Sequence, residues 1–368
     1  MMKRLYLDIH ALQVLPPSCV NRDDTNTPKT CISGGKVRTR VSSQCWKRAA
    51  RKYMKETEIE SIGIRTKRLA DSIKNRLIEE YSYTIDDAVK LADITASAFG
   101  ASPCETEDKN GKKKTEDDAN GVIMFLSNDQ INIITDFAAK NQSEILKEKV
   151  AFRDNKKNPE IKKKLFEQAK MAKTSDILLF GRMFAKAPTL NSDAACQVAH
   201  AFSVNETRAE YDYFTAVDDI PNEFSRGSAY LDVKQFTDPI LYRYANINLS
   251  ETSELIKYDK DNAARIASNF VKAFLLSMPT GSMNGYANAT LPDYVMTTLR
   301  DDMPVSFAPA FIKTVSTDDF EAEAENKLIV YEEKISKNYG APLVKLSLKE
   351  HSLKEILNIL EREIEERL

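Results

Sequence analysis

The sequence has few of the residues that metal centres, disulfide frameworks and membrane spans require. Its three histidines leave little material for a histidine-based metal site or a catalytic triad. Its five cysteines are widely spaced and form no C-x-x-C pair, which favours free thiols. No run approaches the roughly 20 apolar residues of a membrane span, and Asp8 and His10 interrupt the apolar N-terminus that a signal peptide would need. We therefore expect a cytoplasmic protein without membrane contact, metal or other cofactor.

What the chain does have is a dense positive segment. The formal charge of the 368 residues is −2, yet residues 21–52 hold nine Lys or Arg and two Asp. A polyphosphate partner explains such a segment most simply, because Lys and Arg attract a phosphate backbone and release its counterions. The sequence contains neither a Walker A pattern nor an aromatic RNP signature. We expect a binder that holds a nucleic-acid backbone without reading its bases.

Two periodic stretches make up this segment. Residues 34–43 start with a Gly pair and then alternate, which predicts a short strand with Arg38, Arg40 and Ser42 on a basic face. A helix follows, and Ser42 or Ser43 can cap it. Its predicted apolar face carries Trp46, Ala49, Ala50, Tyr53 and Met54. Its predicted basic face carries Lys47, Arg48, Arg51, Lys52 and Lys55.

The remaining pattern predicts an α+β fold. Residues 5–11 alternate as a strand with one buried face, whereas 56–100 and 121–180 are mostly helical in spacing. The highly charged stretch 105–121 between them is typical of a surface loop. Further strands and helices follow from about residue 241, and a capping box at Ser352–Glu355 opens the last helix. Residues 210–236 favour an extended or hairpin-like excursion, so the core is expected to carry two protrusions.

A second basic tract lies in residues 152–170. One interpretation is the solvated, lysine-rich end of a helix, and the other is a contact with nucleic acid. The residues concerned are Lys156, Lys157, Lys162, Lys163 and Lys164.

Several short motifs together resemble a known family. The N-terminal ones lie at 21–24, 28–29, 34–35, 40–44 and 47–49, and the others are GRM (181–183), AHA (199–201), FTAVDD (214–219), YRYANIN (242–248) and PTG (279–281). In this order they resemble the CasC backbone subunit, the "Cas seven" family protein of the type I-E CRISPR Cascade complex. The motifs span nearly the whole chain.

The resemblance implies an RRM-like (ferredoxin-like) palm with a helical fingers insertion and a protruding thumb. The palm would be built from 1–56, 181–202 and 238–368, the fingers from 57–180 and the thumb from 203–237. It also implies a non-catalytic role in antiviral defence. Copies would polymerise along the CRISPR RNA spacer as a filament, together with other Cascade subunits, and leave the guide bases free to pair with target DNA.

The resemblance also implies roles for particular residues. The thumb aromatics Tyr213 and Phe214 would pack at a kinked nucleotide, Met183 would wedge against bases, and Gly281, Ser282, Met283 and Asn284 would approach the RNA at the palm edge. The lysines of the second basic tract would touch target DNA. The residues expected to contact the guide backbone are Lys29, Arg40, Ser42, Gln44, Lys47, Arg48 and Arg51.

Two other functions remain open at this point. Asp23 and Asp24 are expected in a loop beside a basic groove, so metal-assisted cleavage of target RNA is the main alternative. If the chain is instead a DNA-binding regulator, its basic helix enters a major groove and it prefers duplex DNA to single-stranded RNA.

Overall fold

The computed structural model describes residues 4–104, 106–107, 113–114, 122–154, 157, 159–217, 228–316 and 319–368. The chain divides into two compact units. Met1–Ile59 and Cys196–Leu368 form one, called here the sheet unit, and Glu60–Ala195 form the other, called the helical unit.

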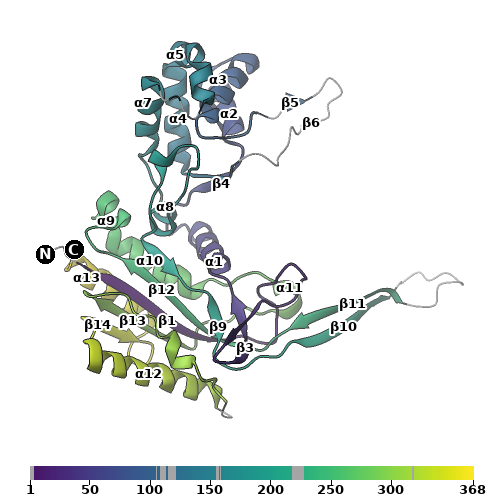
Figure 1. Cartoon of the computed structure of the whole chain (residues 1–368), viewed down its shortest axis with the longest axis vertical. Helices are drawn as coiled ribbons and strands as arrows, with labels where there is room; N and C mark the ends of the chain where they lie inside the picture. The colour runs from purple at the N-terminus through teal and green to yellow at the C-terminus, as the bar shows by residue number, and fades with distance from the viewer. Residues whose placement is uncertain are drawn as a thin grey trace, which may run out of the picture. The chain divides into compact units, whose positions relative to one another are not determined.

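The sheet unit is built on an antiparallel eight-stranded sheet (Figure 1). Its strand order is β14-β13-β1-β12-β9-β3-β2, and β8 also pairs with β12. Strand β1 lies between β13 and β12, near the middle of the sheet. The strands are β1 (Tyr6–Val14), β2 (Thr30–Ser33), β3 (Lys36–Val41), β8 (Cys196–Val198), β9 (Ala201–Ser203), β12 (Ile240–Asn248), β13 (Tyr294–Arg300) and β14 (Val344–Ser347).

Helices cover both faces of this sheet (Figure 1). The helices α1, α10 and α13 pack together, and α12 and η2 also pack together. The capping box predicted at Ser352 is confirmed, because Ser352 and Glu355 each accept a hydrogen bond from the other's backbone N–H. The helices are α1 (Ser43–Glu56), α9 (Glu254–Asp259), α10 (Ala263–Leu276), α11 (Met283–Tyr286), η2 (Ala308–Phe311), α12 (Phe320–Tyr339) and α13 (Leu353–Glu365).

The prediction that β1 has one buried face is wrong, because both of its faces are buried. Leu7 and Ile9 are fully covered on one side. On the other, the His10 ring stacks on Phe307 with the ring centres 4.0 Å apart. On that same side, Asp8 accepts a 2.6 Å hydrogen bond from the Tyr244 hydroxyl. Polar side chains inside a strand therefore do not mark a solvent face when packed elements supply their partners.

A long hairpin extends from the sheet unit (Figure 1). It is formed by β10 (Glu210–Val217) and β11 (Ser228–Phe236), which pair antiparallel with Tyr213 opposite Val233. The predicted hairpin-like excursion is confirmed for these strands. Asp218 and Asp219 of the FTAVDD motif lie outside the described residues.

The helical unit has its own core. Leu77, Leu91, Ile134, Phe152 and Leu165 are all buried in it. Two small antiparallel pairs, β4 with β7 and β5 with β6, accompany the helices. The elements are β4 (Ile64–Thr66), α2 (Leu69–Tyr81), α3 (Ile85–Ser97), β5 (Thr106–Glu107), β6 (Lys113–Lys114), β7 (Met124–Leu126), α4 (Asn128–Lys140), α5 (Gln142–Lys147), α6 (Lys149–Arg153), α7 (Glu160–Ala169), α8 (Ser175–Phe180) and η1 (Pro188–Leu190).

The helical unit extends further along the chain than the predicted insertion, 57–180. Its last residue is Ala195, because Phe184 and Leu190 are buried in the helical core. The buried Arg182 guanidinium also donates to the Gln130 side chain at 2.7 Å. The predicted palm segment 181–202 is therefore divided between the two units. Most of the predicted loop 105–121 lies outside the described residues. Among the helices of the described ranges, none is long and apolar enough to cross a bilayer.

Candidate nucleic-acid interface

The β2–β3 hairpin presents the first basic side chains. Its two-residue turn is Gly34-Gly35, with φ of 61° and 75°. A turn with positive φ at both central residues matches the twist of paired strands and favours glycine. Gly34 is also required for space, since a Cβ there would lie 1.9 Å from the Ile312 carbonyl oxygen.

Helix α1 follows β3 with the predicted cap and the predicted buried face. Ser42 is the N-cap, and its hydroxyl accepts a 3.3 Å hydrogen bond from the Cys45 N–H. Trp46 and Met54 are buried, whereas Arg48 and Lys52 are exposed. No acidic residue stands in the first turn, so the positive end of the helix dipole is not neutralised locally.

Backbone hydrogen bonds bring Lys29, Arg40 and the start of α1 onto one surface. The Asn21 side chain accepts from the Ser42 N–H at 2.9 Å, and its carbonyl accepts from the Lys29 N–H at 2.9 Å. The Lys29 carbonyl in turn accepts from the Arg40 N–H at 2.8 Å. Asn21 therefore joins three separate pieces of the positive segment.

His200 belongs to the same surface, although it is not among the site residues predicted from the sequence. Its Nδ1 lies 3.0 Å from the Arg40 guanidinium. Burial, then the positive charges of Arg40 and Lys29, lower the pKa of His200. His200 is the central residue of the AHA motif, but only the pairing of β9 with β3 brings it to Arg40, so the motif alone does not assign it to this surface.

The predicted basic face of β3 needs one correction. Arg38 is buried and donates to the carbonyls of Ser203 and Val204 at 2.8 Å and of Phe311 at 2.9 Å. Arg40, two residues on, is only partly buried. The hydrogen bonds of Arg38 therefore link β3 to the segment of Ser203 and Val204 and to the segment of Phe311. Its guanidinium is not available to a ligand.

Four other residues predicted to contact the guide backbone differ in exposure. Ser42 is buried and its hydroxyl serves the helix cap, so a phosphate bound there would compete with the cap. Gln44 is exposed at the N-terminus of α1, and Lys47 and Arg51 are partly buried on the same helix.

The loop before Lys29 is fixed by Asp23. Asp23 Oδ1 accepts from the N–H groups of Thr25 and Thr27 at 2.9 and 3.0 Å, and Oδ2 accepts from the Thr27 hydroxyl at 2.8 Å. Hydrogen bonds from the Thr25 and Thr27 side chains lower the pKa of Asp23 to about 2. Both carboxylate oxygens are therefore engaged in the turn. Among the described residues, no three His, Cys, Asp or Glu side chains are grouped to hold a metal ion.

The predicted turn at residue 281 packs against this loop. A Cβ on Gly281 would lie 2.2 Å from the Val20 carbonyl oxygen, so only glycine permits the approach. A hollow of about 410 Å³ separates Gly281 from α1, and Arg22, Arg48 and Lys52 line it. Ser282 lines a second hollow of about 420 Å³ between the loop and the base of the hairpin. On α11, Met283 is half-buried and Asn284 is exposed.

The β10–β11 hairpin places on opposite faces the two aromatic residues that were predicted to pack at one kinked nucleotide. Tyr213 and Phe214 are consecutive in β10, so their side chains point to opposite faces. Tyr213 is 62% exposed and shares its face with the exposed Val233. Phe214 instead contacts the Tyr230 ring and lies beneath the Lys234 ammonium, 4.5 Å away. The two rings therefore cannot pack on the same side of one nucleotide.

The helical unit presents its predicted methionine to solvent. Met183 is 78% exposed, which excludes a core role for it. It follows Gly181, whose φ of 69° favours glycine, and the anchored Arg182.

The lysines of residues 152–170 differ in exposure. Lys162 is buried, and its ammonium donates to the carbonyls of Phe152 and Asp154 at 3.2 and 3.3 Å. Its predicted contact with DNA does not fit that burial. Lys157, Lys163 and Lys164 are exposed, and Lys156 lies outside the described residues.

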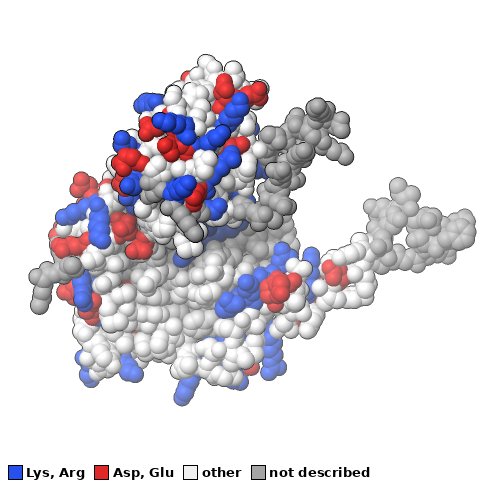
Figure 2. Space-filling view, turned by 45° about the horizontal axis from the view of Figure 1, so that its top comes forward, with Lys and Arg blue, Asp and Glu red and all other residues white. Residues whose placement is uncertain are grey.

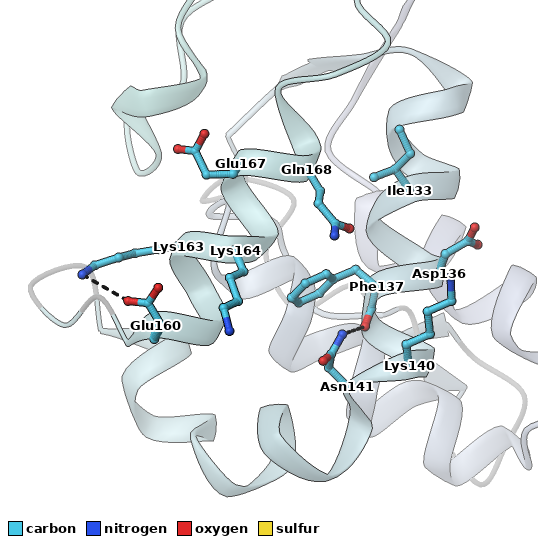
Figure 3. Close-up of a pocket in the computed structure, with 10 residues that line it drawn as sticks. All are labelled: Ile133, Asp136, Phe137, Lys140, Asn141, Glu160, Lys163, Lys164, Glu167 and Gln168. Carbon is cyan, nitrogen blue, oxygen red and sulfur yellow. Dashed lines mark hydrogen bonds and ion pairs between the residues drawn. The ribbon is translucent and has the colours of Figure 1, made fainter.

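A pocket of about 640 Å³ separates α4 from α7, and Lys140 and Lys164 both border it (Figure 3). Its carboxylates have cationic partners nearby: Glu160 pairs with Lys163 and Glu167 with Lys170. Within the described part of the chain, the ammonium groups of Lys140 and Lys164 make no hydrogen bond or ion pair. Basic and acidic side chains alternate over the visible face of this unit (Figure 2).

The comparisons with known proteins identify the family. The model of the CT1975-like protein family matches residues 7–367, so the chain belongs to this family. No curated protein gave a match.

Solved structures give the fold and its context. A chain described as "CRISPR RNA-guided surveillance complex, pre-nicking" is 33% identical with a TM-score of 0.81, covering 99% of this chain and 100% of that one. A chain of another "CRISPR RNA-guided surveillance complex" is 28% identical with a TM-score of 0.69, covering 98% and 99%. The predicted α+β class is confirmed, and the resemblance to a CRISPR complex subunit agrees with both structures. The type I-E assignment stays a prediction.

Proposed function

We propose that this chain is a backbone subunit of a CRISPR surveillance complex that binds guide RNA through its phosphates. Similarity over nearly the full length to chains of two such complexes supports the role. Type I-E is the subtype that the sequence motifs favour. The subunit would work in the cytoplasm and would be non-catalytic.

The main support for the proposal is that cationic side chains from separate segments of the chain lie on one surface. Lys29 comes from the loop before β2, Arg40 from β3 and Arg48 from α1, beside a helix N-terminus without acidic residues. Such a surface attracts phosphates and fixes the register of a strand without reading its sequence. The guide bases would then remain available for pairing with target DNA.

In this role, the two units and the β10–β11 hairpin would correspond to the palm, fingers and thumb of such a subunit. The sheet unit would be the RRM-like palm, the helical unit the fingers and the β10–β11 hairpin the thumb. Copies would assemble along the RNA with other subunits of the complex, and each exposed Tyr213 face would meet RNA or a neighbouring copy. Lys163, Lys164 and Lys140 would face target DNA.

The alternative of a metal-dependent endoribonuclease receives little support from the loop. A metal ion at Asp23 would have to displace the hydrogen bonds from Thr25 and Thr27. Incubation of the assembled particle with Mg²⁺ and RNA complementary to its guide tests this directly. We expect no periodic cuts, whereas cuts lost in Asp23→Ala or Asp24→Ala would make the protein an enzyme.

A binding assay tests the proposed function. The full chain is titrated into labelled single-stranded RNA and into duplex DNA at several salt concentrations. We expect a preference for RNA, and an affinity that falls with salt and falls at least about tenfold in the double variant Lys47→Glu, Arg51→Glu. The matched control Lys337→Glu, Lys354→Glu makes the same charge change at exposed positions on α12 and α13 and should bind as the parent does. Preference for duplex DNA would instead support a regulator.

A further inference from the structure

His200 lies beside the start of α1 because of strand register. Strand β9 pairs antiparallel with β3, with Phe202 opposite Arg40 and Ala201 opposite Val41. One position further along, the same register sets His200 against Ser42, the N-cap of α1. The imidazole is exposed at this point.

The hydrogen bond to Arg40 defines the protonation state of His200. A guanidinium can only donate, so the Nδ1 atom that lies 3.0 Å from it must accept. The imidazole is therefore neutral, with its proton on Nε2. Protonation of Nδ1 would break this bond and place two cations side by side.

The charged groups that act on His200 are positive. Arg40 on β3 and Lys29 in the loop before β2 both lower its pKa, in addition to burial. The N-terminus of α1 adds a partial positive charge. The thiols of Cys31 on β2 and Cys45 on α1, which interact with Arg40 and Lys29 respectively, have pKa values raised by burial, so they stay neutral near pH 7.

We propose that an RNA phosphate seated among Arg40, Lys29 and His200 draws a proton onto His200, so that RNA binding and protonation of this residue are coupled. The proton comes from solvent and goes to Nδ1. The Arg40 hydrogen bond to Nδ1 is exchanged for one from Arg40 to phosphate, and the new Nδ1–H donates to the same anion. The inference rests on the proposed RNA-binding function and adds a titrating residue to that site.

Linkage gives the direction of the effect. The free protein holds His200 neutral, whereas the phosphate offsets the charges of Arg40 and Lys29 and favours the imidazolium. RNA-bound protein therefore carries more protons than free protein, and affinity falls as pH rises through the interval between the two pKa values. Over that interval the limit is a tenfold loss per pH unit, and we expect a loss of about three- to tenfold between pH 6 and 8.

Anisotropy titrations of the full chain with labelled single-stranded RNA, at constant ionic strength and at pH 6, 7 and 8, test the coupling. His200→Gln keeps an acceptor for Arg40 but cannot gain a proton, so its affinity should vary less than about twofold over this range. His351→Gln, which changes a histidine at the start of the last helix, should keep the parent's pH dependence. Asp8, with a pKa raised to about 7 by burial, is present in all three proteins, so their differences isolate His200.

Calorimetry of the same RNA in buffers of different ionisation enthalpy counts the protons taken up. We expect a net uptake for each bound site in the parent and almost none in His200→Gln. Tight RNA binding with equal pH dependence in the two proteins would overturn the coupling and leave the proposed function intact. If neither protein binds RNA at any pH, the proposed function and the coupling both fail.

Discussion

The guanidinium of Arg243 lies 3.8 Å from the centre of the Trp46 ring. Arg243 is a buried residue of β12, and Trp46 is the buried anchor of α1, so this contact fixes the basic helix on the sheet. Arg243 also donates to the Gln13 side chain and the Phe274 carbonyl. The orientation of the proposed RNA surface therefore depends on a residue that no ligand would touch.

Replacing this arginine should destabilise the protein strongly. Arg243→Ala removes the cation over Trp46 and leaves the Gln13 and Phe274 acceptors unpaired in the core. We expect the free energy of unfolding to fall by about 2–5 kcal/mol, measured by denaturant titration. Arg265→Ala, on the exposed side of α10, is the matched control and should change it by less than about 0.5 kcal/mol. Equal effects would contradict the role assigned to Arg243.

The pH dependence of stability should reveal two buried groups with opposite effects. Burial lowers the pKa of His10 to about 3 and raises that of Asp8 to about 7. Between pH 4 and 6.5 the unfolded chain binds a proton at His10 that the fold excludes, so this group makes stability rise with pH. At Asp8 the fold binds a proton that the unfolded chain has lost, so stability falls with pH. The two contributions oppose each other.

A variant in which Asp8 can no longer titrate should show the contribution of His10 to the pH dependence of stability. Relative to the parent, the stability of Asp8→Asn should rise more steeply with pH, by about 1.4 kcal/mol per pH unit between pH 4 and 6.5. Thermal or denaturant unfolding at several pH values measures both slopes. Parallel slopes in the two proteins would show that Asp8 does not stay protonated in the fold.

Two glycines on neighbouring stretches offer a matched pair of substitutions. Gly281→Ala forces a Cβ against the Val20 carbonyl, so we expect a loss of about 1–3 kcal/mol in stability and weaker RNA binding. Gly285→Ala meets no atom within 4 Å and should be nearly neutral. The comparison uses unfolding and RNA titrations side by side. If Gly281→Ala binds RNA as the parent does, the turn at 281 is not part of the interface.

The lysines of α7 should separate into structural and surface classes. Lys162→Met leaves the Phe152 and Asp154 carbonyls without their donor and should cost about 1–3 kcal/mol in unfolding free energy. Lys164→Met should leave stability nearly unchanged and lower the affinity of the guide-bound particle for target DNA. A stable Lys162→Met variant that loses DNA affinity would restore the original sequence prediction for this residue.

Local patterns in the sequence predicted correctly the features that depend on residues close together in the chain, such as helix caps and buried helix faces. The cap at Ser42, the buried Trp46 face and the last helix follow from spacing that the fold retains. The exposure and the neighbours of other site residues depend on contacts between separate segments of the chain, which local patterns do not show. Arg38 looks like a surface cation in the sequence, but it donates to the distant carbonyls of Ser203 and Val204, and His200 gains its role only when β9 pairs with β3. Lys162 is buried by contacts with the nearby segment that holds Phe152 and Asp154, which the spacing within its own helix does not predict.

Guide-RNA binding is checked by purifying the chain after co-expression with a CRISPR array and the other subunits of the complex, and by measuring the amount and length of the nucleic acid bound to it. We expect large particles that contain RNA of one uniform length, and loss of that RNA in the Lys47→Glu, Arg51→Glu variant. Recovery of a folded chain free of RNA, with all partner subunits present, would contradict the proposed function.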